Sequence, residues 1–383
     1  VRWERIPCRS PMPCGRSSIS CGKRADLPTG NSRIGELASV LSRRRIDLFL
    51  CVRMTNIRYL CGFSGSDGIL LVSGAGNFFI TDGRYEEQSR REVRGAEVII
   101  SDRKWREVSR RIRRIRPSLV GFESRHLSVE QFRHLSGGDE SKWKPLSDPV
   151  GKLRMRKDMD EILSMESAAV TAAGALLSVL SRGIRGRTES EVAADIEREM
   201  KRAGAEDASF RPIVASGKRA AMPHAVPTSS PIGDREAVVI DFGARKAGYC
   251  SDETVTVLPD RPSAAIRRAF DAVRRAQDAG IRSIRPGIPC REVDARVRES
   301  LDRSGYLKYF VHSTGHGVGL DIHERPTLSI RSGDRLAEGM VVTVEPGVYL
   351  PGEGGVRLED MVRITGTRGE RITYLPKTGS RLV

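Results

Sequence analysis

The chain has 383 residues, of which 39% are hydrophobic and 30% are charged, and its formal net charge is +16. This length predicts more than one domain and is ample for a sizeable hydrophobic core. No uninterrupted apolar stretch approaches the roughly 18 residues of a membrane-spanning helix, so we expect a soluble globular protein with no membrane partner. The arginines are mixed with acidic residues on expected helices and are not interleaved with aromatic residues. This pattern argues against a dedicated nucleic-acid partner.

The seven cysteines form an odd and dispersed set. Such a set argues against a disulfide framework and favours a reducing compartment, so we predict a cytoplasmic location. Three of them, Cys8, Cys14 and Cys21, lie in the Arg-, Ser- and Pro-rich residues 1–30 and lack a close C-x-x-C pair for zinc. Residues 1–30 also contain no apolar segment long enough for a secretory signal. We predict that they form a disordered extension.

Residues 31–148 alternate between strand-like and helix-like patterns, which predicts an α/β domain. The expected strands are residues 46–52, 68–73, 77–85, 96–100 and 118–124, and the expected helices are residues 34–44, 86–93 and 103–116. A cluster of Ser, Asp, Pro and Gly at residues 147–151 then interrupts the periodic pattern. Such clusters tolerate linker conformations, so we expect a second domain at residues 152–383.

Helices are expected in two pairs in the second domain, and each pair precedes a group of strand-like segments. The helices are residues 157–182, 188–204, 263–284 and 291–304. Thr188 and Glu191 have the spacing of a capping box at the start of the second helix. Because the order of two helices followed by strands appears twice, the pattern is weakly indicative of an internal structural duplication.

Residues 237–258 predict a β-hairpin between the two helix pairs. Its first strand is apolar, its second strand is rich in Thr and Val, and the turn falls at Ala247 and Gly248. In such a hairpin Asp241 and Asp252 would be neighbours on adjacent strands.

Four carboxylates and one imidazole are concentrated at the ends of expected buried strands and in glycine-framed segments. These residues are Asp241, Asp252, His316, Glu345 and Glu359. Carboxylates at the ends of buried strands need partners, and four of them close together would repel one another unless cations neutralise them. An oxygen-rich set with one imidazole suits two divalent metal ions, Mn²⁺ above all, with Co²⁺, Zn²⁺ or Fe²⁺ as alternatives. In the competing interpretation, these residues occupy exposed turns, as most acidic residues do.

Several segments resemble motifs of the pita-bread metallopeptidases, the family of methionine aminopeptidase, aminopeptidase P and prolidase. In the second domain these segments are residues 210–225, 238–256, 312–324 and 339–362. Residues 55–68 and 78–89 resemble the creatinase-like domain that precedes the catalytic domain in proline-specific members, which methionine aminopeptidases generally lack. The resemblance therefore implies an α/β (α+β) chain with a creatinase-like N-terminal domain and a pita-bread catalytic domain.

The resemblance also implies roles for individual residues. Asp241 would bind one metal ion in bidentate fashion, Asp252 and Glu359 would bridge both ions, and His316 and Glu345 would complete the other. The implied catalytic residues are His224, His323 and Glu345, and the implied substrate-binding residues are His224, His312, His323 and Arg357. His323 would stabilise the tetrahedral intermediate, and Glu345 would accept a proton from the attacking water.

The implied reaction is hydrolysis of the bond before a penultimate proline in small peptides, by a hydroxide that bridges two metal ions, in a homodimer. The motifs at residues 55–89 favour an Xaa-Pro aminopeptidase, while an Xaa-Pro dipeptidase (prolidase) shares the same fold and ligands. A non-catalytic peptide-binding module and a creatinase-like carbon–nitrogen hydrolase are less favoured, because all five candidate ligands are present. Family members often carry Arg where this chain has Val255, from which we expect altered electrostatics near the ligands or altered substrate contacts.

Overall fold

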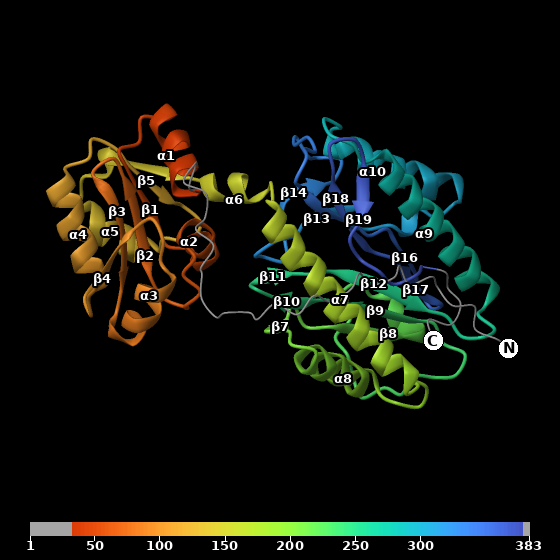
Figure 1. The fold of residues 1–383 in the computed structure, drawn as a ribbon. Coiled ribbons are helices and arrows are strands. Elements are labelled where there is room, and N and C mark those ends of the chain that lie inside the picture. The colour runs from red at the N-terminus through yellow and green to blue at the C-terminus, as the bar shows by residue number, and fades with distance from the viewer. Residues whose placement is uncertain (1–32, 378–383) are drawn as a thin grey trace, which may run out of the picture.

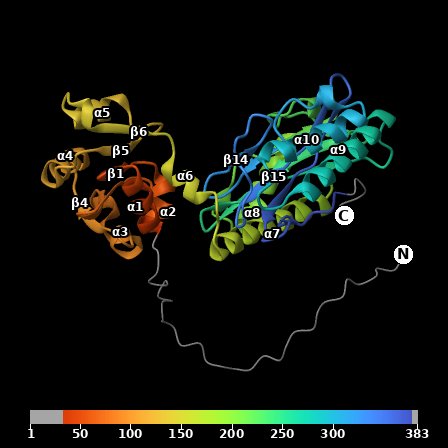
Figure 2. The ribbon, with the colours of Figure 1, turned by 90° about the horizontal axis from the view of Figure 1, so that it is seen from above.

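The computed structural model describes residues 33–377. A six-stranded mixed sheet with helices on its faces forms the first part of the structure, and a larger part with antiparallel sheets and four long helices follows. Helix α6 (Pro149–Arg154) lies between the two parts in both views (Figures 1 and 2). The predictions for residues 1–30, including their three cysteines, lie outside the described residues.

The first sheet has the strand order β4-β3-β2-β1-β5-β6. Its strands are β1 (Leu48–Cys51), β2 (Ile69–Ser73), β3 (Gly76–Thr81), β4 (Glu97–Ile100), β5 (Val120–Glu123) and β6 (Trp143–Leu146). Alternate residues of β1 face two different hydrophobic clusters, because successive side chains of a strand point to opposite faces. The covering helices are α1 (Arg33–Arg43), α2 (Met54–Cys61), α3 (Glu86–Glu92), α4 (Lys104–Ile115) and α5 (Val129–Ser136). The sequence patterns did not predict α2, α5 or β6.

The expected linker at residues 147–151 begins helix α6 rather than an extended segment. Asp148 caps this helix, since its Oδ1 accepts a hydrogen bond from the backbone N–H of Gly151 at 2.8 Å. Val150 belongs to a hydrophobic cluster that includes Phe49 of the first sheet and Val341 of the second part. The two parts are therefore joined by a shared apolar contact as well as by the chain.

The second part begins with α7 (Met159–Ser181) and α8 (Glu189–Arg202), and α9 (Ala264–Ser283) and α10 (Cys290–Arg303) follow later. Its longer strands are β8 (Ile213–Ser216), β9 (Val238–Phe242), β12 (Glu253–Val257), β13 (Gly315–Gly317), β14 (Glu324–Leu328), β15 (Val341–Val344), β16 (Gly347–Leu350), β17 (Gly354–Arg357) and β18 (Asp360–Ile364). Short strands β7 (Asp207–Ala208), β10 (Ala244–Lys246), β11 (Tyr249–Cys250) and β19 (Gly369–Arg371) complete the list. The predicted capping box of Thr188 and Glu191 is present.

Helix α7 is long and apolar enough to cross a membrane by length and hydropathy alone. However, 56% of its most apolar window is buried inside the protein, where residues such as Leu176 and Val179 pack against α8 and strand β9. A buried core helix can have the same length and hydropathy, so α7 by itself is only weak evidence for a membrane span.

The predicted hairpin needs one correction. The tight turn at Ala247 and Gly248 is present between β10 and β11, with φ angles of 48° and 80°. In the main β9–β12 ladder, however, the direct partner of Asp241 is Thr254, and Asp252 lies just before the strand. The two-residue turn accounts for the difference, because it pairs Lys246 with Tyr249 and Arg245 with Cys250, and the same register continued along the strands places Thr254 opposite Asp241.

Candidate active site

The five candidate metal ligands come from two sheets that meet at one backbone bridge. Asp241 lies in β9 and Asp252 precedes β12, while His316 lies in β13, Glu345 follows β15 and Glu359 lies between β17 and β18. Thr254 and Glu359 form an isolated antiparallel bridge, in which the N–H of Glu359 donates to the carbonyl of Thr254 at 3.1 Å. This bridge brings the ligand-bearing ends of the two sheets together.

Donor atoms of three of these residues lie within metal-binding reach of one another. One donor atom from each of Asp252, His316 and Glu359 lies within 4.8 Å of the other two. The Nε2 atom of His316 lies 3.6 Å from Oδ2 of Asp252 and 3.4 Å from Oε1 of Glu345. A single cation could therefore contact ligands from three different strands or strand ends.

The electrostatics of the carboxylates show that they lack sufficient compensating positive charge from the protein. Burial, together with the neighbouring carboxylate of Glu359, raises the pKa of Asp252 well above its usual value. Burial and Glu345 raise the pKa of Glu359 in the same way, and burial and Asp241 raise the pKa of Glu345 to about 8. Bound cations would reverse these shifts by stabilising the ionised forms.

Asp241 supplies a second indication of a cation-binding site. Its Oδ2 accepts a hydrogen bond from Nη2 of Arg357 at 2.6 Å, whereas its Oδ1 is buried and has no partner among the described residues. A buried unpaired carboxylate oxygen is costly in a folded protein. The donor set and this orphan oxygen together fit divalent metal ions.

His316 is prepared as a neutral ligand. Its Nδ1 lies 3.1 Å from the carbonyl oxygen of Gly317, a geometry that places the proton on Nδ1 and leaves the Nε2 lone pair free. Burial, and then the proximity of His323, lower the pKa of His316 to about 4. The ring of His323 is close by, with 4.4 Å between the two ring centroids, and its side chain is exposed to the cavity.

Arg357 and Tyr349 connect the cluster to His312. Nη1 of Arg357 donates to the hydroxyl oxygen of Tyr349 at 3.0 Å, and this hydroxyl lies 2.9 Å from Nε2 of His312. Nδ1 of His312 donates to the carbonyl of Ser313 at 2.8 Å, so Nε2 is the acceptor for the Tyr349 hydroxyl. Burial lowers the pKa of His312 to about 4, which keeps this ring neutral.

His224 lies on the loop that precedes β9 and is exposed. The carbonyl of its neighbour Pro223 accepts a hydrogen bond from Nη1 of Arg357 at 3.0 Å, so Arg357 also fixes this loop. A cavity of about 720 Å³ brings all of the predicted residues together. Its lining includes Asp241, Asp252, His316, Glu345, Glu359, His224, His312, His323 and Arg357.

Sequence reasoning missed several residues of the site. Tyr349 and Thr254 hold the charged groups in place, and Arg53, Arg125 and His126 line the cavity from the first part of the chain. Tyr349 lies inside the glycine-framed segment, which was a usable signal, whereas the three residues of the first part carried none.

Val255 behaves differently from our expectation. Its side chain is 2% exposed and belongs to the hydrophobic cluster under β9, with Ile240 and Leu176, rather than to the cavity lining. Thr254 faces the ligands, and adjacent residues of a strand point to opposite faces. The structure therefore does not support altered substrate contacts at Val255.

Comparisons with known proteins agree with this geometry. The profile of the creatinase/prolidase N-terminal domain matches residues 33–156, and the profile of metallopeptidase family M24 matches residues 161–366. The Xaa-Pro dipeptidase of Pyrococcus furiosus is 34% identical over 346 residues, which cover 89% of this chain and 97% of that protein.

Two solved structures are also similar. An Xaa-Pro dipeptidase from Bacillus anthracis has 38% identity and a TM-score of 0.87, covering 90% of this chain and 97% of that chain. An X-Pro aminopeptidase from Thermotoga maritima has 33% identity and a TM-score of 0.83, covering 90% of this chain and 98% of that chain. The predicted fold, a creatinase-like domain followed by a pita-bread catalytic domain, is confirmed. The chain belongs to metallopeptidase family M24, whose members use divalent metal ions.

Proposed function

We propose that this chain is an Xaa-Pro dipeptidase, which hydrolyses the bond between the two residues of a dipeptide that ends in proline. The observation that carries the proposal is the composition of the cavity. One side holds the cluster of carboxylates and histidines, and the first part of the chain adds Arg53, Arg125 and His126 to the lining. Arg125 makes no hydrogen bond or ion pair within residues 33–377 and is exposed.

An unpaired guanidinium in the lining is suited to the free carboxylate of a dipeptide, because Arg recognises carboxylates through paired hydrogen bonds. A longer peptide has a neutral amide in place of that carboxylate. The similar proteins named Xaa-Pro dipeptidase favour the same substrate class. The motifs at residues 55–89 favoured the aminopeptidase, which stays the second candidate because the Thermotoga maritima protein carries that name.

We propose that two divalent ions, Mn²⁺ by preference, are held by the five candidate ligands. These are Asp241, Asp252, His316, Glu345 and Glu359, and donor atoms of Asp252, His316 and Glu359 lie within 4.8 Å of one another. When bound, the ions would lower the pKa of a water molecule and polarise the scissile carbonyl. The mainly oxygen donor set is the basis for preferring Mn²⁺ over a softer ion.

The proposed role of Glu345 is to accept the proton of the attacking water. Its Oε1 accepts a hydrogen bond from the hydroxyl of Thr343 at 3.2 Å, and its backbone N–H donates to the carbonyl oxygen of Thr314 at 2.8 Å, so both the side chain and the backbone of this residue are held. His323 is proposed to donate to the oxygen on which negative charge develops. Its contact with the ring of His316 places it beside the ligand cluster.

The proposed substrate-positioning residues are His224, His312 and Arg357. The hydroxyl of Tyr349 is hydrogen-bonded to Nε2 of His312, so this nitrogen is not free to bind the substrate. The imidazole ring would contact the substrate through its edge or its face. Arg357, which is 4% exposed, would act mainly by orienting Asp241 and the loop of His224. A cytoplasmic location and a homodimer also stay proposals. The location is supported by four described cysteines that are free and buried.

The experiment measures kcat/KM of the metal-loaded protein for an Xaa-Pro dipeptide and for the same dipeptide with a C-terminal amide. We expect the amide to be the poorer substrate by about a hundredfold in kcat/KM, because it lacks the carboxylate that Arg125 would bind. Arg125→Gln should make the two kcat/KM values more similar, because it should lower kcat/KM for the dipeptide and leave that for the amide unchanged. Equal rates for the dipeptide and its amide would remove the support for the dipeptidase and favour the aminopeptidase.

A further inference from the structure

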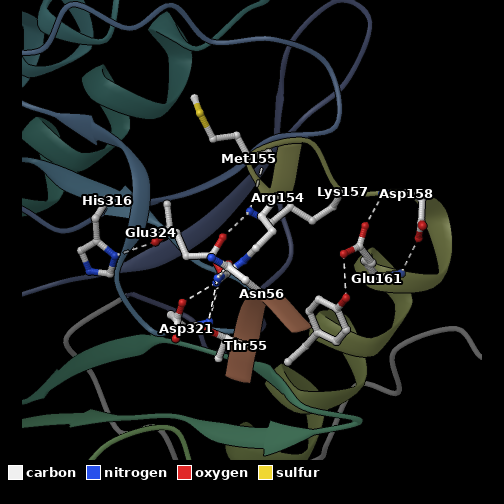
Figure 3. A network of polar contacts seen from close by, with 12 residues as sticks. Thr55, Asn56, Arg154, Met155, Lys157, Asp158, Glu161, His316, Asp321 and Glu324 are labelled. Carbon is white, nitrogen blue, oxygen red and sulfur yellow. Dashed lines mark hydrogen bonds and ion pairs between the residues drawn. The ribbon is translucent and has the colours of Figure 1, made fainter. Parts of the chain in front are cut away.

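The loop that carries His323 is tied to the first part of the chain by a buried arginine. Arg154, from helix α6, is 3% exposed. One of its two terminal nitrogens contacts the first part of the chain, and the other contacts the catalytic part. Its Nη1 donates to Oδ1 of Asn56 at 2.7 Å in helix α2. Its Nη2 contacts the carboxylates of Asp321 and Glu324 in the catalytic part. Figure 3 shows Arg154 between Asn56 on one side and these two carboxylates on the other.

The two carboxylates flank His323 in the sequence. Asp321 precedes it by two residues, Glu324 follows it directly, and Oε1 of Glu324 accepts the backbone N–H of Asp321 at 3.0 Å, which closes the loop on itself. Gly319 allows this approach, because a Cβ there would lie 2.7 Å from the same Glu324 oxygen. The His323 ring makes no hydrogen bond within the described part of the chain. Its position therefore depends on where these neighbours hold the backbone.

The network continues into the core of the first part. Nδ2 of Asn56 donates to Oε1 of Glu123 at 2.5 Å, and Oε2 of Glu123 accepts the backbone N–H groups of Val52 and Arg53 at 2.7 and 2.8 Å. Asn56 and Glu123 are 1% and 2% exposed. Asn56 can satisfy both neighbours only in one amide orientation, so its orientation fixes Arg154 relative to the first sheet.

Two further cations balance the charges of the network. Nη2 of Arg53 lies 2.7 Å from Oδ2 of Asp321, and Nζ of Lys157 lies 3.3 Å from Oε2 of Glu324. With Arg154 they make three cations, and the network contains the three carboxylates of Asp321, Glu324 and Glu123, so its formal charges sum to zero. Removing one member would leave an uncompensated buried charge, which costs more than the pair itself contributes.

We propose that Arg154 is a positioning residue for His323, and that through the contact between Arg154 and Asn56 the first part of the chain controls the rate of the reaction. Arg154 lines the same cavity, but within residues 33–377 it makes no hydrogen bond or ion pair with the candidate ligands or with His323. Its effect reaches the chemistry through the backbone of residues 321–324. A displacement of a catalytic group by about 1 Å can lower a rate about a hundredfold, so a shift of this loop would be visible in kcat. The inference rests on the proposed peptidase reaction of the same site.

The test is a double-mutant cycle between Arg154 and His323 in the full-length, metal-loaded protein. We expect Arg154→Lys, which keeps the charge but loses the forked geometry, to lower kcat about tenfold or more with an unchanged metal content. In the His323→Ala background the same substitution should lower kcat less than about twofold, because the group being positioned is absent. Equal losses in both backgrounds would overturn the proposal, as would metal loss that accounts for the whole effect.

The matched control is Arg111→Lys. Arg111 is also largely buried and paired with a carboxylate, that of Glu107, but it lies in α4, outside the cavity lining. If this control lowers kcat as much as Arg154→Lys, a general loss of stability explains the result and the proposal fails. Should Arg154→Lys not fold, Asn56→Ala takes its place in the same cycle with the same expected pattern.

Amide hydrogen exchange separates this inference from the proposed function. Arg154→Lys should speed exchange in residues 319–324 about tenfold or more, while Arg111→Lys should leave these amides unchanged. If the wild-type protein cleaves no Xaa-Pro peptide, the proposed function fails, yet this change in exchange would still support the link between Arg154 and the loop. If the protein cleaves the dipeptide but neither exchange nor kcat responds to Arg154→Lys, the inference alone is wrong.

Discussion

Arg357 donates from Nη2 to Oδ2 of Asp241 at 2.6 Å, and the other oxygen of this carboxylate is buried without a partner among the described residues. One oxygen is therefore held by the protein, and the other is left for a cation. The same guanidinium also donates to Tyr349 and to the carbonyl of Pro223, so it links the candidate ligands with the histidines of the cavity.

Arg357→Lys should lower kcat/KM about a hundredfold, because an ammonium cannot reach Asp241, Tyr349 and Pro223 at the same time. We expect a smaller effect on folding, since the positive charge is retained. Steady-state rates and bound metal measured on the same samples check this. Arg363→Lys, in a neighbouring strand outside the cavity lining, is the control. Equal rates for the Arg357 variant and this control would contradict the role given to Arg357.

Glu359→Gln should abolish metal binding and activity while raising the thermal stability of the chelator-treated protein. The reason is that burial and neighbouring carboxylates raise the pKa of Glu359, so its charge is unfavourable when no cation is present. We expect an increase of a few degrees in Tm, measured in chelator, relative to wild type. The exposed Glu353→Gln serves as the control. A lower Tm for Glu359→Gln in chelator would count against the repulsive cluster.

His323→Ala should retain the full metal content and lose about a hundredfold to a thousandfold in kcat. His323 is not one of the candidate ligands, and donors that act on developing charge contribute effects of this size. Metal analysis beside single-substrate kinetics separates the two properties. The exposed His134→Ala, on helix α5, should change neither. Loss of metal in proportion to activity would instead make His323 a ligand.

His312 predicts a loss of stability in acid. Burial lowers the pKa of His312 from 6.5 to about 4, so between these values the unfolded chain binds a proton that the folded protein excludes. The contribution is fully present above pH 6.5 and is lost as the pH falls towards 4. Because the ring is partly exposed, we expect a contribution on the order of 1–2 kcal/mol.

His312→Asn should remove that part of the acid sensitivity. Denaturant unfolding of the chelator-treated protein gives the free energy of unfolding at pH 7 and at pH 4.5. The difference between these two values should be smaller for the variant than for wild type. His134→Asn, whose ring is exposed, should behave as wild type. If the His312 variant keeps the full difference, other groups cause the acid sensitivity.

Local sequence signals were sufficient for the long helices and for selecting candidate ligands that lie together. Thr188 and Glu191 predicted the start of α8, and the five candidate ligands all line one cavity as expected. The register around Asp241 follows from the predicted two-residue turn at Ala247 and Gly248, which places Thr254 rather than Asp252 opposite Asp241. The eight-residue helix α2 is too short for its periodicity to stand out.

Contacts between the two parts were also beyond the sequence patterns. Arg53 and Asp321 are 268 residues apart, and each alone has the appearance of an ordinary surface charge. Their pairing arises only when α6 and the shared hydrophobic cluster bring the first sheet against the catalytic part. The cavity lining from the first part, including Arg125, follows from the same arrangement.

The most direct test of the central claim compares hydrolysis of an Xaa-Pro dipeptide with that of the matching Xaa-Pro-Yaa tripeptide. The protein is stripped of metal and resupplied with Mn²⁺, Co²⁺ or Zn²⁺, with Glu359→Gln as the metal-free control. We predict metal-dependent cleavage of the dipeptide, fastest with Mn²⁺, and a kcat/KM for the tripeptide lower by about a hundredfold or more. Faster cleavage of the tripeptide would identify an aminopeptidase instead, and no cleavage with any of the three metals would contradict the proposed reaction.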